Sequence, residues 1–159
     1  MVIRIPEGSD EAVLASLVMN ASCVPGLFSG RLGLRRPGDE VLTVGEERKK
    51  KVLVYGGSSS FGRLSVRYLR NAGYAVTTTS SPRHMDSVRE MGRDSVVDYT
   101  LPSEQVVREL EVRRPYEVVV DMISTPQTIH ITSQIMKAQG GGRLYATQPS
   151  FGPKICQMV

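Results

Sequence analysis

The sequence predicts an α/β fold, a doubly wound parallel sheet of about five strands with a helical leader at its N-terminus. From residue 51 onward, short apolar runs rich in β-branched residues alternate with stretches of helical periodicity. A turn of small residues follows the first apolar run and opens a helix. The run over residues 116–123 is apolar enough for a strand that is covered on both faces. Such a strand is typical of a parallel sheet with helices on both sides.

Length and composition indicate one globular domain. The chain has 159 residues, of which 40% are hydrophobic and 23% charged, ordinary values for a globular protein. No apolar run approaches the about 18 residues of a membrane helix, and the N-terminus lacks the pattern of a secretory signal. Cys23 and Cys156 are far apart and in no metal-ligand spacing. We therefore expect a cytoplasmic protein with free thiols, no metal and no membrane contact.

The formal net charge is +4, with basic residues scattered except for a run over residues 48–51. This run fits a solvated strand edge, and a modest positive field also suits a phosphate-rich ligand. A nucleic-acid surface would need more basic residues with aromatic residues between them, and Trp is absent. We therefore expect no nucleic-acid partner.

Residues 1–50 form the expected leader, with two helical patterns and no clear strand. Asp10 is placed to cap a first helix, and a second apolar stretch follows Pro25 and Gly26. Cys23 lies in this leader, as a nucleophile or, by the simpler interpretation, as a small buried thiol. The apolar residues that carry the two patterns are Leu14, Leu17, Val18, Leu27, Phe28 and Leu32.

Residues 51–149 carry the expected sheet domain, and residues 150–159 form an irregular tail. Right-handed crossovers between the strands predict the order 3-2-1-4-5. Ser103 is expected to cap one of the connecting helices. The strands are expected at residues 52–55, 74–79, 95–99, 116–123 and 143–147, and the helices at 64–71, 85–91, 103–110 and 128–138.

The glycine-rich turn, residues 56–62, predicts a phosphate-binding site of the Rossmann type. Gly56 and Gly57 permit a tight turn, and Gly62 permits close packing of helix on strand. Small side chains between them let the backbone approach a pyrophosphate at the positive helix N-terminus. The strict G-x-G-x-x-G pattern is not met, so a tight turn that binds nothing remains an alternative. The small side chains in question are those of Ser58, Ser59 and Ser60.

The end of the second strand favours NADP(H) over NAD(H). NAD-preferring domains place an acid here to hold the ribose 2′-hydroxyl, and none is present. Ser80, Ser81 and Arg83 instead offer hydroxyls and a guanidinium that suit a 2′-phosphate. A polar loop with a surface arginine is the alternative.

Other polar residues are weaker candidates. Asp98 and Asp121 end strands, where active-site residues gather, but a strand-end cap and a turn-forming acid explain them as well. His84 and His130 have no carboxylate or cysteine at metal-ligand spacing. Tyr145 fits a core position.

The combined motifs resemble the medium-chain dehydrogenase/reductase superfamily. The resemblance covers residues 6–149 and is nearest to its zinc-independent enoyl and quinone reductases, above all the trans-acting enoyl reductases of fungal polyketide pathways. The motifs that carry it are residues 52–62, 78–82 and 91–99, together with Ser22-Cys23 and Leu32-Gly33-Leu34.

The resemblance implies a set of cofactor-binding residues. Ser59, Ser60 and Phe61 correspond to the pyrophosphate turn. Ser80, Ser81 and Arg83 correspond to the 2′-phosphate pocket, and Tyr99 to the adenosine side. The loop beside the nicotinamide ribose corresponds to Ile123 and Ser124, and a small hydroxyl near the nicotinamide to Ser22.

The family's β-rich substrate domain has no counterpart in this sequence. No residue therefore inherits a proton-donor role, and we expect a cofactor domain that needs a dimer mate or partner to complete a pocket for a small-molecule substrate. The alternatives are a non-redox isomerase or cyclase, a pseudoenzyme that binds a biosynthetic synthase, and a truncated product.

A homo-oligomer is expected for a related reason. Residues 143–147 would leave an unpaired sheet edge, and Leu17, Val18, Leu27 and Phe28 would expose apolar surface. A tail that folds back over this edge within one monomer is the rival interpretation.

Overall fold

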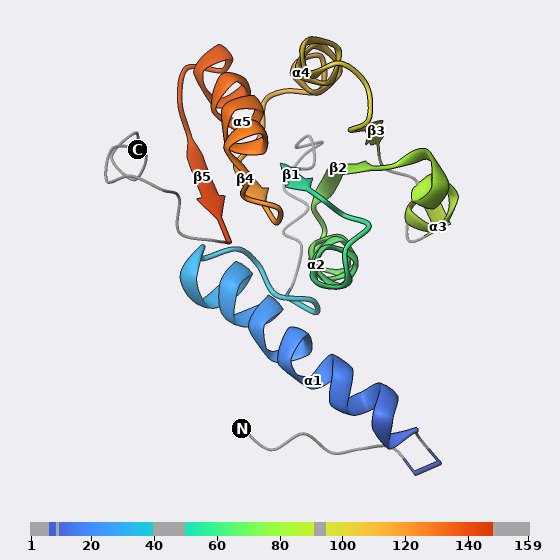
Figure 1. Cartoon of the computed structure of the whole chain (residues 1–159). Helices are drawn as coiled ribbons and strands as arrows, with labels where there is room; N and C mark the ends of the chain where they lie inside the picture. The colour runs from blue at the N-terminus through green and yellow to red at the C-terminus, as the bar shows by residue number, and fades with distance from the viewer. Residues whose placement is uncertain (1–6, 9, 40–49, 91–94, 148–159) are drawn as a thin grey trace.

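A computed structural model describes residues 7–8, 10–39, 50–90 and 95–147, and its strands and helices alternate from residue 51 as expected (Figure 1). The leader holds the α-helix α1 and the π-helix η1, and the short 3-10 helix η2 precedes α3. The elements are α1 Glu11–Pro25, η1 Gly26–Arg31, β1 Lys51–Tyr55, α2 Ser60–Asn71, β2 Ala75–Ser80, η2 Pro82–His84, α3 Met85–Glu90, β3 Val96–Asp98, α4 Ser103–Glu111, β4 Val118–Asp121, α5 Pro126–Ala138 and β5 Arg143–Ala146.

The five strands form one parallel sheet in the order β3-β2-β1-β4-β5, which confirms the predicted topology. β1 lies at the centre. Its Val52 is paired with Val76 of β2 on one side and with Val118 of β4 on the other. The chain passes from β1 to β2 and β3 in one direction and returns past β1 to β4 and β5. The strand order therefore reverses between β1 and β4, where ligands bind in sheets of this kind.

Alternate residues of β1 face two separate cores. Val52 and Val54 pack with the apolar residues of α2 and the leader. Leu53 and Tyr55 pack with those of α4 and α5 on the opposite face. All four are buried, and full burial of an aliphatic side chain such as that of Leu53 stabilises the fold by roughly 1.5–3 kcal/mol. The central strand is thus held from both sides, and the turn that follows it has a rigid base.

The leader is fastened to the sheet domain by packing and polar contacts. Phe28 of η1 is fully buried and stacks on Tyr68 of α2 with ring centroids 6.2 Å apart. Arg143 of β5 donates a 2.6 Å hydrogen bond to the carbonyl oxygen of Leu32. The expectation that Leu27 and Phe28 expose apolar surface is therefore wrong, because both fill the core under the sheet.

Exposed residues of the leader lie earlier, in α1. Val18 is 42% exposed and Met19 is 72% exposed. Cys23 is also exposed, so the expected buried thiol is wrong. The neighbouring Val24 is the residue that turns into the core instead.

Helix starts differ from expectation at three places. α2 begins at Ser60, four residues before the predicted start, because the side chain of Ser59 caps it there. Ser103 is the first residue of α4 and does not cap it, because the N-cap position belongs to Pro102, which has no capping side chain. α5 begins two residues earlier than predicted, at Pro126. Thr125 caps it in a capping box with Thr128. The predicted end of α3 at Met91 and the predicted tail lie outside the described residues. Among the helices of the described ranges, none is long and apolar enough to cross a membrane.

Candidate functional site

The carboxyl ends of the strands bring most of the sequence-predicted site residues to one edge of the sheet. The glycine-rich turn follows β1, and the loop from Ser81 follows β2. Tyr99 follows β3, and Ile123 and Ser124 follow β4. A carbon added at Gly56 would lie 2.8 Å from Cγ1 and Cδ1 of Ile123, so the turn and the loop after β4 are in contact. This contact spans the place where the strand order reverses.

Threonines of β2 hold the glycine-rich turn in place. The amide of Gly56 donates a 2.8 Å hydrogen bond to Oγ1 of Thr79, and that of Gly57 donates one of 3.0 Å to the Thr79 carbonyl oxygen. Thr78 is turned the other way, and its Oγ1 donates to Val54 at 2.6 Å. The sequence signal for these contacts is the run of three threonines inside a strand that must be buried.

Three glycines of the turn have distinct physical reasons. Gly56 has a φ of +91°, which side-chain-bearing residues rarely adopt. A Cβ on Gly57 would lie 2.0 Å from Oγ1 of Thr78. A Cβ on Gly62 would lie 2.2 Å from the Gly56 carbonyl oxygen. The expected close approach of helix and strand is therefore present at Gly62.

Ser59 is the cap of helix α2. Its Oγ accepts a 3.0 Å hydrogen bond from the Gly62 amide and donates one of 2.8 Å to the Gly56 carbonyl oxygen. The first backbone hydrogen bond of the helix runs from the Arg63 amide to the Ser59 carbonyl oxygen. The amides of Ser60 and Phe61 precede it, so they are placed to donate to an anion at the helix N-terminus.

Helix α1 also reaches this turn, through a residue that sequence analysis missed. Nδ2 of Asn20 donates a 3.0 Å hydrogen bond to Oγ of the exposed Ser60. Ser22 points elsewhere, because its Oγ donates to the carbonyl oxygens of Val18 and Met19 on its own helix. The nicotinamide contact of Ser22 stays a prediction. No sequence pattern in α1 marks Asn20 as the contact residue.

The loop after β2 combines a buried and an exposed part. Ser80 is fully buried, and its hydroxyl donates to the Ser81 carbonyl oxygen. Ser81 is half-buried, and Arg83 and His84 are exposed. The Tyr99 amide donates to the Ser80 carbonyl oxygen, so this loop and the exposed Tyr99 ring belong to one corner of the sheet edge. The corner offers a cation and an aromatic ring to solvent.

The loop after β4 is built on Asp121, which is fully buried. One carboxylate oxygen accepts 2.9 Å hydrogen bonds from the amides of Ile123 and Ser124. The other accepts a 2.6 Å hydrogen bond from Oγ1 of Thr128. The turn-forming role of Asp121 is therefore present in the structure. Both oxygens of its carboxylate already accept hydrogen bonds from the protein. A ligand at this edge would therefore meet the loop and not the Asp121 carboxylate.

Ser124 has a strained backbone conformation that hydrogen bonds hold in place. Its φ is +56°, in the left-handed region where non-glycine residues are uncommon. Its Oγ donates a 2.9 Å hydrogen bond to the Asp121 carbonyl oxygen. Strain of this kind persists where neighbouring contacts enforce it, and it gathers at binding sites. The backbone between β4 and α5 is therefore held in one shape beside the glycine-rich turn.

Tyr55 stays protonated at the end of β1. Burial, with smaller contributions from the carboxylate of Asp121 and the ring of Tyr99, raises the pKa of Tyr55 to about 12. Its hydroxyl is therefore neutral at physiological pH.

Other candidates lie apart from this edge or have structural partners. Asp98 accepts hydrogen bonds from the amide and the hydroxyl of Thr100, as a strand-end cap does. His130 is exposed on α5, and Tyr145 of β5 is half-buried beneath the guanidinium of Arg31. The described residues hold no group of three or more His, Cys, Asp or Glu that would suit a metal ion.

Sequence comparison shows that the chain is a homologue of fungal trans-enoyl reductases. Trans-enoyl reductase eqxC of Fusarium heterosporum is 35% identical over 149 residues, which cover 94% of this chain and 41% of that protein. Trans-enoyl reductase milB of Cordyceps militaris is 30% identical over 98% of this chain and 42% of its own length. The chain thus spans about two fifths of these relatives. No protein-family model matches it.

Solved structures show the same fold in enoyl and quinone reductases of the medium-chain superfamily. The CurK enoyl reductase superposes with a TM-score of 0.66 at 12% identity and covers 92% of this chain and 47% of that one. A mycobacterial protein in complex with NADPH superposes with a TM-score of 0.67 at 18% identity, over 93% and 49% of the two chains. The resemblance expected from the glycine-rich turn and its flanking strands is confirmed at the level of fold and relatives.

Proposed function

We propose that this chain binds NADP(H) across the carboxyl edge of its sheet and forms the cofactor half of an enoyl reductase. The pyrophosphate lies on the amides of Ser60 and Phe61, the adenosine end beside Arg83 and Tyr99, and the nicotinamide end beside the loop of Ile123 and Ser124. NADP(H) is the hydride carrier of such a reductase. The chain's own residues bind the cofactor and orient it.

The observation that carries this proposal is the geometry of the glycine-rich turn. The turn is tied to β2 by two hydrogen bonds, capped by Ser59, and shaped so that a Cβ at Gly57 or Gly62 would clash. Its helix N-terminus opens where the strand order reverses. The trans-enoyl reductase names of the relatives and the NADPH bound to one structural neighbour support the same cofactor.

We expect the wall of the pocket that contacts the substrate to come from residues other than those described. A pocket needs walls on both sides of the nicotinamide, and this sheet edge offers one. We propose that a second copy of the chain or a partner, such as a biosynthetic synthase, supplies the other wall of the pocket. The small-molecule substrate that this pocket would hold is an α,β-unsaturated acyl group. The enoyl reductase names of the relatives support this substrate class.

A carboxylate at the helix N-terminus tests the cofactor site. Ser60→Asp places a negative charge where the pyrophosphate would lie, and we expect NADPH binding, followed by nucleotide fluorescence, to weaken about tenfold or more. Ser103→Asp is the matched control, because Ser103 is also the first residue of a helix, α4. It adds the same charge at the start of α4, where the Ser103 hydroxyl accepts a hydrogen bond from Gln127 of α5 and not from the glycine-rich turn, and it should leave NADPH affinity within about twofold.

If Ser60→Asp and the unchanged chain bound NADPH with equal affinity, the proposal that the pyrophosphate lies on this turn would be rejected. Both variants should fold, since an acid suits a helix N-terminus. Thermal unfolding followed by circular dichroism checks this.

A second candidate is a non-redox enzyme on the same domain, such as an isomerase or cyclase. One structural neighbour, described as an ER cyclopropanase of curacin A biosynthesis, superposes with a TM-score of 0.62 at 16% identity. This likeness supports a cyclase as the alternative. A chain that converts an acyl substrate without oxidising NADPH, as judged by absorbance at the nicotinamide band, would favour this second candidate.

A further inference from the structure

Arg63 stands out because one nitrogen of its side chain is buried without a partner. It occupies the first turn of α2, directly after Gly62. Its Nε is buried and has no hydrogen-bond acceptor among the described residues. A buried donor of a charged group that lacks an acceptor costs free energy. A fold that keeps such a group needs another contribution to offset it. Because Nε is closed to solvent, an anion would be held by the outer nitrogens of the guanidinium, and its charge would offset part of this cost.

The side chain lines a hollow of about 540 Å³ between α2 and α3. Arg63, Arg67 and Asn71 line it from α2, and Ser87 and Glu90 from α3. Within the described part of the chain, no ion pair joins either arginine to Glu90. The hollow therefore holds two guanidinium groups and one carboxylate, with an excess of positive charge.

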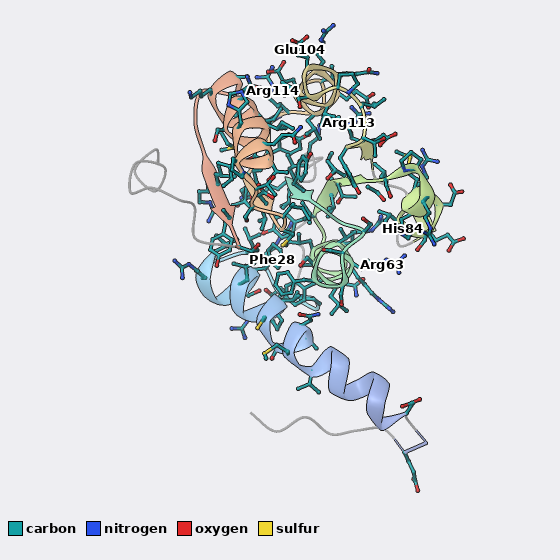
Figure 2. All side chains as sticks on the ribbon, viewed as in Figure 1. Phe28, Arg63, His84, Glu104, Arg113 and Arg114 are labelled. Carbon is teal, nitrogen blue, oxygen red and sulfur yellow. The ribbon has the colours of Figure 1, made fainter. Side chains whose placement is uncertain are left out.

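The position of the hollow relates it to the cofactor site. Both α2 and α3 begin at the carboxyl edge of the sheet, and η2 (Pro82–His84) leads directly into α3. Arg63 at the start of α2 therefore belongs to the same corner as the loop of Ser81 and Arg83. Figure 2 shows Arg63 and His84 on the α2–α3 side of the molecule. In a dinucleotide domain, the adenosine ribose 2′ position lies between the glycine-rich turn and the end of the second strand.

We infer that Arg63 is a second cation for the 2′-phosphate of NADP(H), acting opposite Arg83. This inference rests on the proposed function and names a second residue, beside Arg83, that sets its cofactor preference. The guanidinium comes from the pyrophosphate side of the corner and Arg83 from the loop after β2. A phosphate has three acceptor oxygens, enough for both forks. NADH places a hydroxyl there and gains nothing from either charge.

Glu90 and Arg67 mark the limits of this assignment. Glu90 is the last residue of α3, and Arg67 lies four residues, about 6 Å, further along α2 than Arg63. Both are exposed. Their charges are screened by water, and they sit away from the edge where the nucleotide binds. Arg67 is therefore the matched control, with the same charge, helix and hollow.

The test is the ratio of the dissociation constants for NADH and NADPH in Arg63→Gln, Arg67→Gln and the unchanged chain. Arg63→Gln should lower this ratio about tenfold or more by weakening NADPH alone. Arg67→Gln should change it by less than about twofold. The ratio cancels general damage to the site. Arg63→Lys, which keeps the charge without the fork, should fall between Arg63→Gln and the unchanged chain.

A binding titration with 2′,5′-ADP against 5′-AMP repeats the comparison without the nicotinamide. A ratio unaltered in Arg63→Gln overturns the inference and leaves the proposed function standing. Equal losses in Arg63→Gln and Arg67→Gln overturn it too, since they would report a diffuse field. An unchanged chain that binds neither NADPH nor 2′,5′-ADP overturns both the inference and the proposed function.

Discussion

Arg83 is the exposed cation in the loop that follows β2, where an NAD-preferring domain would carry an acid. Arg83→Ala removes a charge-assisted contact worth roughly 1.5–3 kcal/mol. We expect NADPH to bind about one to two decades more weakly and NADH to bind almost as before. Competitive fluorescence titration with both nucleotides measures this difference.

Arg89→Ala is the control for Arg83→Ala. Arg89 lies on the same exposed segment but pairs with Asp86 at 3.4 Å. Its loss should leave both affinities nearly unchanged. Equal weakening of NADPH and NADH in Arg83→Ala would take Arg83 out of the 2′-phosphate site.

At the scale of single residues, the sequence predicts those residues whose role depends on the local backbone conformation. The turn glycines and the serines beside them could be named because conformation and space limit those positions to small residues. Asn20 could not be predicted, because its contact with Ser60 joins residues 40 positions apart. The partnerless Nε of Arg63 was equally hidden, since burial of one atom depends on how the surrounding side chains pack.

Gly62 tests the account at the scale of elements, because it sets the distance between α2 and the strand beneath it. Gly62→Ala would place Cβ 2.2 Å from the Gly56 carbonyl oxygen. Backbone must move to make room, and we expect a loss of roughly 1–3 kcal/mol in the free energy of unfolding. Urea unfolding followed by circular dichroism measures this loss.

Gly26→Ala is the companion variant for Gly62→Ala. Gly26 has no atom within 4 Å of a built Cβ, and alanine there should leave stability within about 0.5 kcal/mol or raise it slightly. A Gly62→Ala chain as stable as Gly26→Ala would mean that the helix and strand are less tightly packed than described.

The order of the elements follows from the sequence, whereas their ends depend on tertiary contacts. Apolar runs separated by helical stretches allow few topologies, so the sheet order could be predicted. The strand expected over residues 116–123 is shortened to Val118–Asp121. Its end comes earlier because the Asp121 carboxylate accepts hydrogen bonds from the amides of Ile123 and Ser124, which turns the chain out of the sheet. The start of α5 was readable from Thr125, Pro126 and Thr128, a capping pattern that we did not use.

The π-helix η1 illustrates a shape that sequence periodicity does not encode. Gly26–Arg31 is wound with hydrogen bonds that span five residues, such as the one from the Leu32 amide to the Leu27 carbonyl oxygen, where an α-helix spans four. This segment buries Leu27 and Phe28 in the core that faces α2. The drive to bury Phe28 against Tyr68 is a tertiary effect, so a helical pattern alone predicts the segment but not its winding.

At the scale of the whole molecule, we propose self-association. β5 is hydrogen-bonded to β4 on one side and has no strand on its other side within the described residues. Val18 and Met19 add apolar surface on α1. An open edge and an apolar patch both favour a second chain. Sedimentation at micromolar concentration should show a species heavier than the 17.5 kDa chain, and a single species at that mass would reject self-association.

The cofactor preference of the unchanged chain is the most direct test of the central claim. Calorimetric titration with NADPH and with NADH at one salt concentration gives both dissociation constants and the stoichiometry. We predict one NADPH per chain, bound about tenfold or more tightly than NADH, because only NADPH brings a phosphate between Arg63 and Arg83. Absence of NADPH binding, or equal dissociation constants for the two nucleotides, would contradict the account.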